Sequence, residues 1–173
     1  VLNINKTMAV RWFYEASKDD LRIPASPHAV RFFNYIIPSH INQVYKIIQQ
    51  MAFSSDDKVS KEGSKQVAAR YIFHGFFENE FKNCCNGTIQ QRIAVVSTLA
   101  ELVKDNRYYI KCSEILPQFM NDTDKEVRRE LCSIFNNKDI FHDKQCRELI
   151  EIYVKSNAFI DSADFFIWNL SKF

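Results

Sequence analysis

Apolar residues recur at every third or fourth position between Thr88 and Val103. This spacing is the period of an amphipathic helix, and the stripe consists of Ile89, Ile93, Val96, Leu99, Ala100 and Val103. Thr88 and Gln91 have the spacing of a capping box, in which each side chain satisfies a backbone N–H at the start of a helix. The pattern predicts a helix that begins after Thr88 and ends near Asp105.

Similar periods predict helices along the rest of the chain. A second capping box, Thr123 to Glu126, precedes a stripe that starts at Val127. No segment shows the sustained alternation of apolar and polar residues that a half-buried strand requires. Pro38 should separate two helices and Pro117 should interrupt another. The further helices are expected over residues 7–17, 27–37, 39–51, 56–77, 79–85, 107–120, 144–156 and 162–170.

The composition supports a helical chain. Only 3 of the 173 residues are Gly and 4 are Pro, too few for the many turns of an all-β domain. A chain of this length buries about 70% of its extended surface, so a sizeable core is expected. We predict an all-α fold of about nine or ten helices, with residues 1–173 forming a single domain. Since the sequence has no initial Met, this domain could be excised from a longer protein.

Three turn-and-helix junctions look alike, and they begin at Ser54, Asn86 and Asn121. Successive junctions begin 32 and 35 residues apart, which is close to the length of one two-helix repeat. Residues 115–135 resemble a HEAT repeat, a two-helix unit of the HEAT and armadillo type. The residues that carry this resemblance are Leu116, Pro117, Asp122, Val127 and Arg128.

The resemblance implies an α-solenoid, in which antiparallel helix pairs stack to bury one another's apolar faces. In that family the turn Asp and the Arg of the second helix form a hydrogen-bonded ladder between repeats. Asp122 and Arg128 are therefore expected to be structural, and the alternative is a surface ion pair worth less than about 1 kcal/mol. The second helices of such repeats line a concave face. The exposed candidates for partner binding on it are Lys61, Lys65, Arg92, Lys125 and Arg129.

Few residues of this sequence are candidates for catalysis or for cofactor binding. The three Gly are isolated, so no phosphate-binding loop can form, and the four His are scattered over separate segments. A metal site could use Cys84, Cys85 and Cys112 with a His, but free Cys is more often a buried core residue. We expect no catalytic residue, no metal and no cofactor. The odd number of Cys, five, indicates reduced thiols in a cytoplasmic protein.

A nucleic-acid partner is a second possibility. The net charge of +2 does not favour a dedicated nucleic-acid binder. Tyr108 and Tyr109 nevertheless lie within a local concentration of positive charge, and aromatic rings suit base stacking. Acidic residues interrupt this region, so a mixed, solvated helix face is favoured. The basic residues are Arg92, Lys104, Arg107, Lys111, Lys125, Arg128 and Arg129.

The pattern as a whole indicates a non-enzymatic protein-interaction scaffold or regulatory helical-repeat module with a protein partner. The alternatives are a nucleic-acid-binding HEAT-like module, similar to the DNA glycosylases of that architecture, and a helical segment of a larger multidomain ATPase. No membrane association is expected, since no apolar run approaches the roughly 20 residues of a membrane span. Aromatic clusters near the two ends, at 12–14 and 165–168, either fill the core or dock onto a partner.

Overall fold

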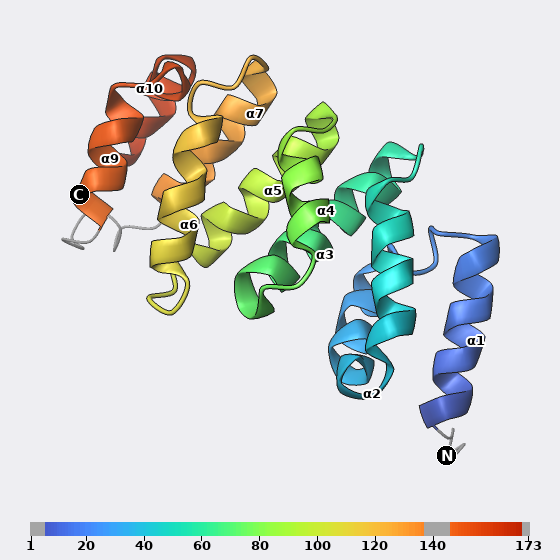
Figure 1. Ribbon diagram of the computed structural model, residues 1–173. Helices are drawn as coiled ribbons and strands as arrows, with labels where there is room; N and C mark the ends of the chain where they lie inside the picture. The colour runs from blue at the N-terminus through green and yellow to red at the C-terminus, as the bar shows by residue number, and fades with distance from the viewer. Residues whose placement is uncertain (1–5, 137–145, 171–173) are drawn as a thin grey trace.

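The computed structural model describes residues 6–136 and 146–170, and every regular element in these two ranges is a helix (Figure 1). The prediction of an all-α fold is confirmed. In this part of the chain no helix is long and apolar enough to cross a bilayer. The elements are α1 (Lys6–Asp19), α2 (Pro27–Ala52), α3 (Asp57–His74), α4 (Glu78–Cys85), α5 (Ile89–Leu102), α6 (Tyr109–Ile115), the 3₁₀ helix η1 (Leu116–Phe119), α7 (Lys125–Glu130), the 3₁₀ helix η2 (Leu131–Asn136), α9 (Arg147–Val154) and α10 (Asn157–Leu170).

Two helices begin where side chains satisfy free backbone N–H groups. Asp56 precedes α3 and accepts hydrogen bonds from the N–H groups of Lys58 and Val59, at 2.9 and 3.2 Å. At α5 the predicted capping box is confirmed. The N–H of Gln91 donates to Thr88 Oγ1 at 3.3 Å, and the N–H of Thr88 donates to Gln91 Oε1 at 2.8 Å. These bonds supply acceptors that a first helical turn lacks.

The second predicted capping box is wrong. Helix α7 begins at Lys125, and its N-cap is Asp124, whose Oδ1 accepts from the N–H of Glu126 at 2.8 Å. The N–H of Asp124 in turn donates to Asp122 Oδ1 at 2.8 Å. Two successive carboxylates thus hold the turn, and the chain enters the helix one residue later than a box on Thr123 requires.

The helices break close to both prolines at which the sequence predicts an interruption. Helix α2 is interrupted by a kink at His40, which has non-helical angles (φ −140°, ψ 38°), so two helices meet there. The predicted separation is confirmed, with the break two residues after Pro38. At Pro117 the predicted interruption is confirmed, because α6 ends at Ile115 and the 3₁₀ helix η1 follows. The start of the helix predicted over 144–156 lies outside the described residues, and α9 begins at Arg147.

Successive helices lie in a row, with α1 at one end and α9 and α10 at the other (Figure 1). Helix α3 packs against α2 and α5, α5 packs against α7 and η2, and α7 and η2 pack against α10. Each helix thereby hides an apolar face against the next one. The core extends along the row and includes the fully buried side chains of Phe33, Ile48, Met51, Leu99, Leu116 and Leu131.

Helices α2 and α3 approach each other closely at Gly63. A Cβ atom there would lie 2.2 Å from the backbone nitrogen of Ala52, so no larger residue fits without a backbone shift. The carbonyl of Ala52 ends α2 and accepts two hydrogen bonds, from Ser60 Oγ at 2.8 Å and from Gln91 Nε2 at 2.7 Å. Gln91 therefore both caps α5 and ties that helix to the end of α2.

Candidate interaction surface

Arg92, on α5, connects this helix to the turn that precedes α7. Its Nε and Nη2 donate to the two carboxylate oxygens of Asp122, at 2.9 and 3.2 Å. Its Nη1 donates to the carbonyl of Gly87, in the turn before α5, at 2.6 Å. The Arg92 and Asp122 side chains are only 16% and 10% exposed, so the pair is shielded from solvent.

Arg128, on α7, makes a similar set of bonds and connects α7 to α10. Its Nε donates to a carboxylate oxygen of Asp161, in α10, and its Nη1 donates to the carbonyl of Asp122. The hydrogen bond from Arg128 holds the pKa of Asp161 below the ordinary value of 3.8. Two ion pairs thus connect successive helices: Arg92 with Asp122, and Arg128 with Asp161. We call these two ion pairs the joints. Both side chains of the second pair are less than one fifth exposed.

The five candidates for partner binding are placed unequally. Lys125 and Arg129 lie one turn apart on α7, with side chains that are 53% and 50% exposed. Lys61 and Lys65 lie one turn apart on α3 and are half-buried. Arg92 is not exposed as expected, because its guanidinium is engaged in the joint with the next helix pair. The structure therefore brings together only Lys125 and Arg129 at a surface open to solvent.

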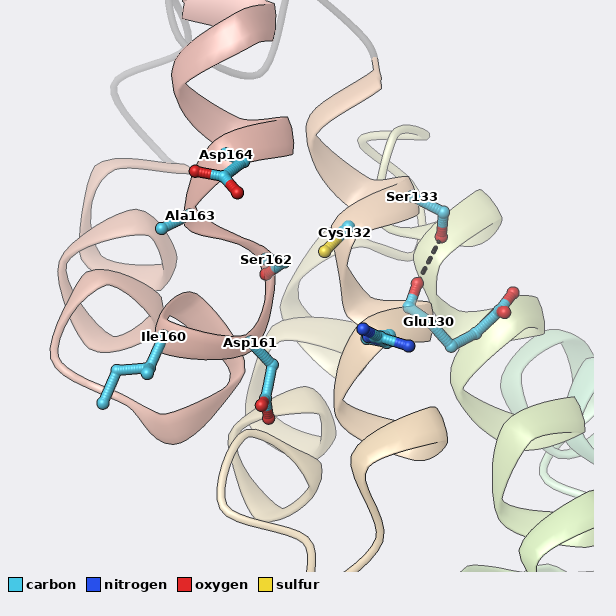
Figure 2. Close-up of a pocket in the computed structure, with 9 residues that line it drawn as sticks. Glu130, Cys132, Ser133, Ile160, Asp161, Ser162, Ala163 and Asp164 are labelled. Carbon is cyan, nitrogen blue, oxygen red and sulfur yellow. Dashed lines mark hydrogen bonds between the residues drawn. The ribbon is translucent and has the colours of Figure 1, made fainter.

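A groove of about 480 Å³ lies beside Arg129, between α7–η2 and α10. Figure 2 shows Ile160, Asp161, Ser162 and Asp164 of α10 on one side and Glu130, Cys132 and Ser133 on the other. Sequence reasoning missed the α10 side of this groove. The sequence Phe159-Ile-Asp-Ser162 is weakly similar to the three turn-and-helix junctions at Ser54, Asn86 and Asn121, and this similarity is the signal that could have indicated it.

Two residues that line the groove, Cys132 and Ser162, are linked through the buried hydroxyl of Tyr153. The buried Tyr153 hydroxyl lies 2.6 Å from Ser162 Oγ and 3.4 Å from Cys132 Sγ. Ser162 also donates to the carbonyl of Ala158, at the bend in α10 where Ser162 has non-helical angles. Burial raises the pKa of the Tyr153 phenol above its ordinary value, so the ring stays neutral at physiological pH. The groove therefore combines neutral, hydrogen-bonded side chains with the charged side chains of Arg129, Glu130, Asp161 and Asp164.

No protein-family model, curated protein or solved structure matches this chain. The surface is therefore interpreted from its own geometry alone.

The basic region with Tyr108 and Tyr109 is largely engaged in internal contacts. Tyr109 is 8% exposed, and the ring of Tyr108 packs against Phe73 at a centroid distance of 4.9 Å. Arg107 pairs with Asp105 at 2.6 Å. Lys111 Nζ donates to the backbone carbonyl of Tyr71 at 2.6 Å and lies 3.9 Å from the centre of the Tyr71 ring. Neither tyrosine presents an open ring face of the kind that base stacking uses.

The cysteines weighed as metal ligands are buried among apolar side chains. Burial raises the pKa of Cys85 and Cys112 to about 12, and it also raises the pKa of Cys84. A thiol with such a pKa is protonated near neutral pH, and metals bind the thiolate. Among residues 6–136 and 146–170, no group of three or more His, Cys, Asp or Glu side chains is arranged to hold a metal ion.

Proposed function

We propose that this chain is a non-enzymatic interaction module of the HEAT-like α-solenoid type, which binds a protein partner in the groove between α7 and α10. The observation that carries this proposal is the repeated joint made by Arg92 and Arg128. Each arginine donates to the turn before its own helix and to an aspartate further along the chain, Asp122 for Arg92 and Asp161 of α10 for Arg128. Two equivalent joints in succession support a stack of repeated units.

The register along the chain supports the same conclusion. Arg92 follows Asn86 by six residues, and Arg128 follows Asp122 by six. The helices that carry or receive these joints, α5, α7 and α10, pack side by side in sequence order. A stack of this kind presents a long continuous surface, which suits recognition of another macromolecule better than enclosure of a small substrate.

The charge distribution favours a protein partner over nucleic acid. Exposed Arg129 lines the groove with Glu130, Asp164 and the exposed side chain of Ile160, so the rim is mixed in sign and partly apolar. Lys125 lies beside it, with Nζ 3.8 Å from a carboxylate oxygen of Asp161. A nucleic-acid surface would need a continuous positive field to neutralise phosphates. The buried, protonated thiols suit a reducing compartment, so we place the module in the cytoplasm.

Charge reversal on α7 tests the proposal. The Lys125→Glu/Arg129→Glu variant should lose about tenfold or more of its affinity for the partner, since rim charges set specificity and encounter rate. The matched control is Lys46→Glu, which reverses an exposed charge on α2 far from the groove. Affinity purification under nuclease treatment, quantified for the three proteins, would identify partners that depend on α7 alone.

A gel shift with DNA and RNA at two salt concentrations would check the other outcome. Tight binding that falls steeply with salt, and that the double variant abolishes, would overturn the proposal in favour of a nucleic-acid partner. Partners captured equally by the wild type and both variants would show that the groove is not the binding site.

A further inference from the structure

The two ends of the row expose large apolar side chains. At the first end, α1 exposes Met8 (48%) and Trp12 (59%), and the turn after it exposes Ile23 (42%). At the last end, α10 exposes Ile167 (59%) and Trp168 (54%). These ends contain both Trp residues of the chain, and aromatic residues anchor protein interfaces more often than other types do.

The first end is concave. A groove of about 450 Å³ lies between α1 and the start of α2. Its lining is mainly apolar and includes Trp12, Phe13, Ile23 and Phe32. Phe13 and Phe32 hold its base, because their rings pack against each other at a centroid distance of 4.9 Å. A protruding apolar side chain of a suitable partner would therefore find a preformed site here.

The last end exposes an apolar side chain, Ile167 of α10, at the sequence position that corresponds to Arg92 and Arg128. Arg92 and Arg128 stand six residues after the turn and bond forward to the following pair. Ile167 occupies the equivalent place, six residues after Asp161. An exposed apolar side chain therefore stands at the position where α5 and α7 carry an arginine, and the exposed Trp168 follows it in the sequence.

The charges of the two ends are complementary. Residues 6–33 contain five basic and three acidic residues, a net charge of +2. Residues 146–170 contain two basic and four acidic residues, and one of the four, Asp161, is paired with Arg128 of α7, which leaves this end a net charge of −1. Opposite charge favours contact of the first end with the last end and disfavours contact between two identical ends.

We propose that copies of this chain associate head to tail, with Ile167 and Trp168 of one copy entering the groove beside Trp12 of the next. An apolar projection that fits a groove elsewhere on the same molecule makes a heterologous contact, which leaves one free site at each end of the assembly. The association therefore grows with concentration instead of stopping at a dimer. It is independent of the function proposed above, because neither face includes the groove between α7 and α10.

Sedimentation velocity over a concentration series tests this association. The wild-type chain should show an average mass that rises continuously with concentration. Trp12→Glu or Ile167→Glu should each weaken the association by about 30-fold or more, as loss of a central interface anchor does. The matched control is Ile110→Glu on α6, which alters a side chain that is 70% exposed but lies at neither end, and it should associate like the wild type.

Mixing the two variants is the decisive step. Trp12→Glu keeps an intact last end and Ile167→Glu keeps an intact first end, so the mixture should form a one-to-one complex that grows no further. A wild-type chain that is monomeric at every concentration would overturn the proposal. So would a mixture that fails to associate, or one variant that still dimerises alone, since a symmetric contact would explain the latter. Circular dichroism of each variant, with Met8→Glu as a second substitution at the first end, separates these outcomes from unfolding.

Discussion

At the scale of single residues, Arg128 holds three parts of the chain together: its own helix, the turn at Asp122 and the bend in α10. Arg128→Met keeps the length of the side chain but leaves a shielded Asp161 carboxylate without its main partner. We expect the free energy of unfolding to fall by about 2–3 kcal/mol, the cost of orphaning a buried charged acceptor. Urea denaturation would measure this loss.

Arg107→Met is the matched control for that substitution. Arg107 pairs with Asp105, but its side chain is 75% exposed, so its removal should leave the free energy of unfolding close to the wild-type value. Equal losses in the two variants would show that the joint at Arg128 adds nothing beyond an ordinary surface pair.

The same joint predicts a dependence on pH. The pKa of Asp161 is lowered in the folded chain by Arg128, so its contribution to stability is present above its unfolded pKa and is lost as the pH falls through the folded pKa. The difference in unfolding free energy between wild type and Asp161→Asn should be constant from about pH 7 to 5 and shrink below about pH 4. A difference that does not change with pH would contradict the role assigned to this carboxylate.

The residues of the joints were only partly predictable. Asp122 and Arg128 stood out because they fit a HEAT repeat, but their partners, Arg92 and Asp161, lie 30 and 33 residues away along the chain. Which arginine reaches which aspartate depends on how one helix pair sits on the next. Helical spacing alone carries no such information, and for that reason Arg92 was expected at the open surface.

At the scale of the helices, the start of α7 offers a direct comparison of two capping residues. Asp124→Ala should lower the unfolding free energy by about 1 kcal/mol, because Asp124 accepts from the N–H of Glu126. Thr123→Ala should change it by only a few tenths of a kcal/mol, since Thr123 is exposed and is not the cap. Thermal melts of both variants would check the order, and a larger loss at Thr123 would restore the capping box expected from the sequence.

The helices themselves followed well from the sequence, because each apolar stripe must face a core. Five of the six residues in the stripe predicted from Thr88 to Val103 are buried, and the stripe fails only at Ile89, which is 41% exposed in the first turn of α5. Boundaries were harder to predict. The carboxylate of Asp124 competes with Thr123 for the same N–H groups, and the break predicted at Pro38 falls two residues later, at His40.

At the scale of the whole molecule, a layered row predicts an elongated particle. A compact globule of 173 residues has a radius of gyration of about 16 Å. Small-angle scattering from the dilute Ile167→Glu variant, in which the proposed end-to-end association is weakened, should give a clearly larger value. A radius near that of a globule would contradict the stacked arrangement while leaving the all-α fold intact.

Gln91 links local and long-range order through a single amide group. Its oxygen completes the first turn of α5, while its nitrogen binds the last carbonyl of α2, which lies 39 residues earlier. A thermal fluctuation that frays the start of α5 must therefore also loosen the boundary between neighbouring units. Opening at one boundary is thereby coupled to melting of the adjacent helix, so this part of the row should exchange its amide hydrogens as one cooperative block.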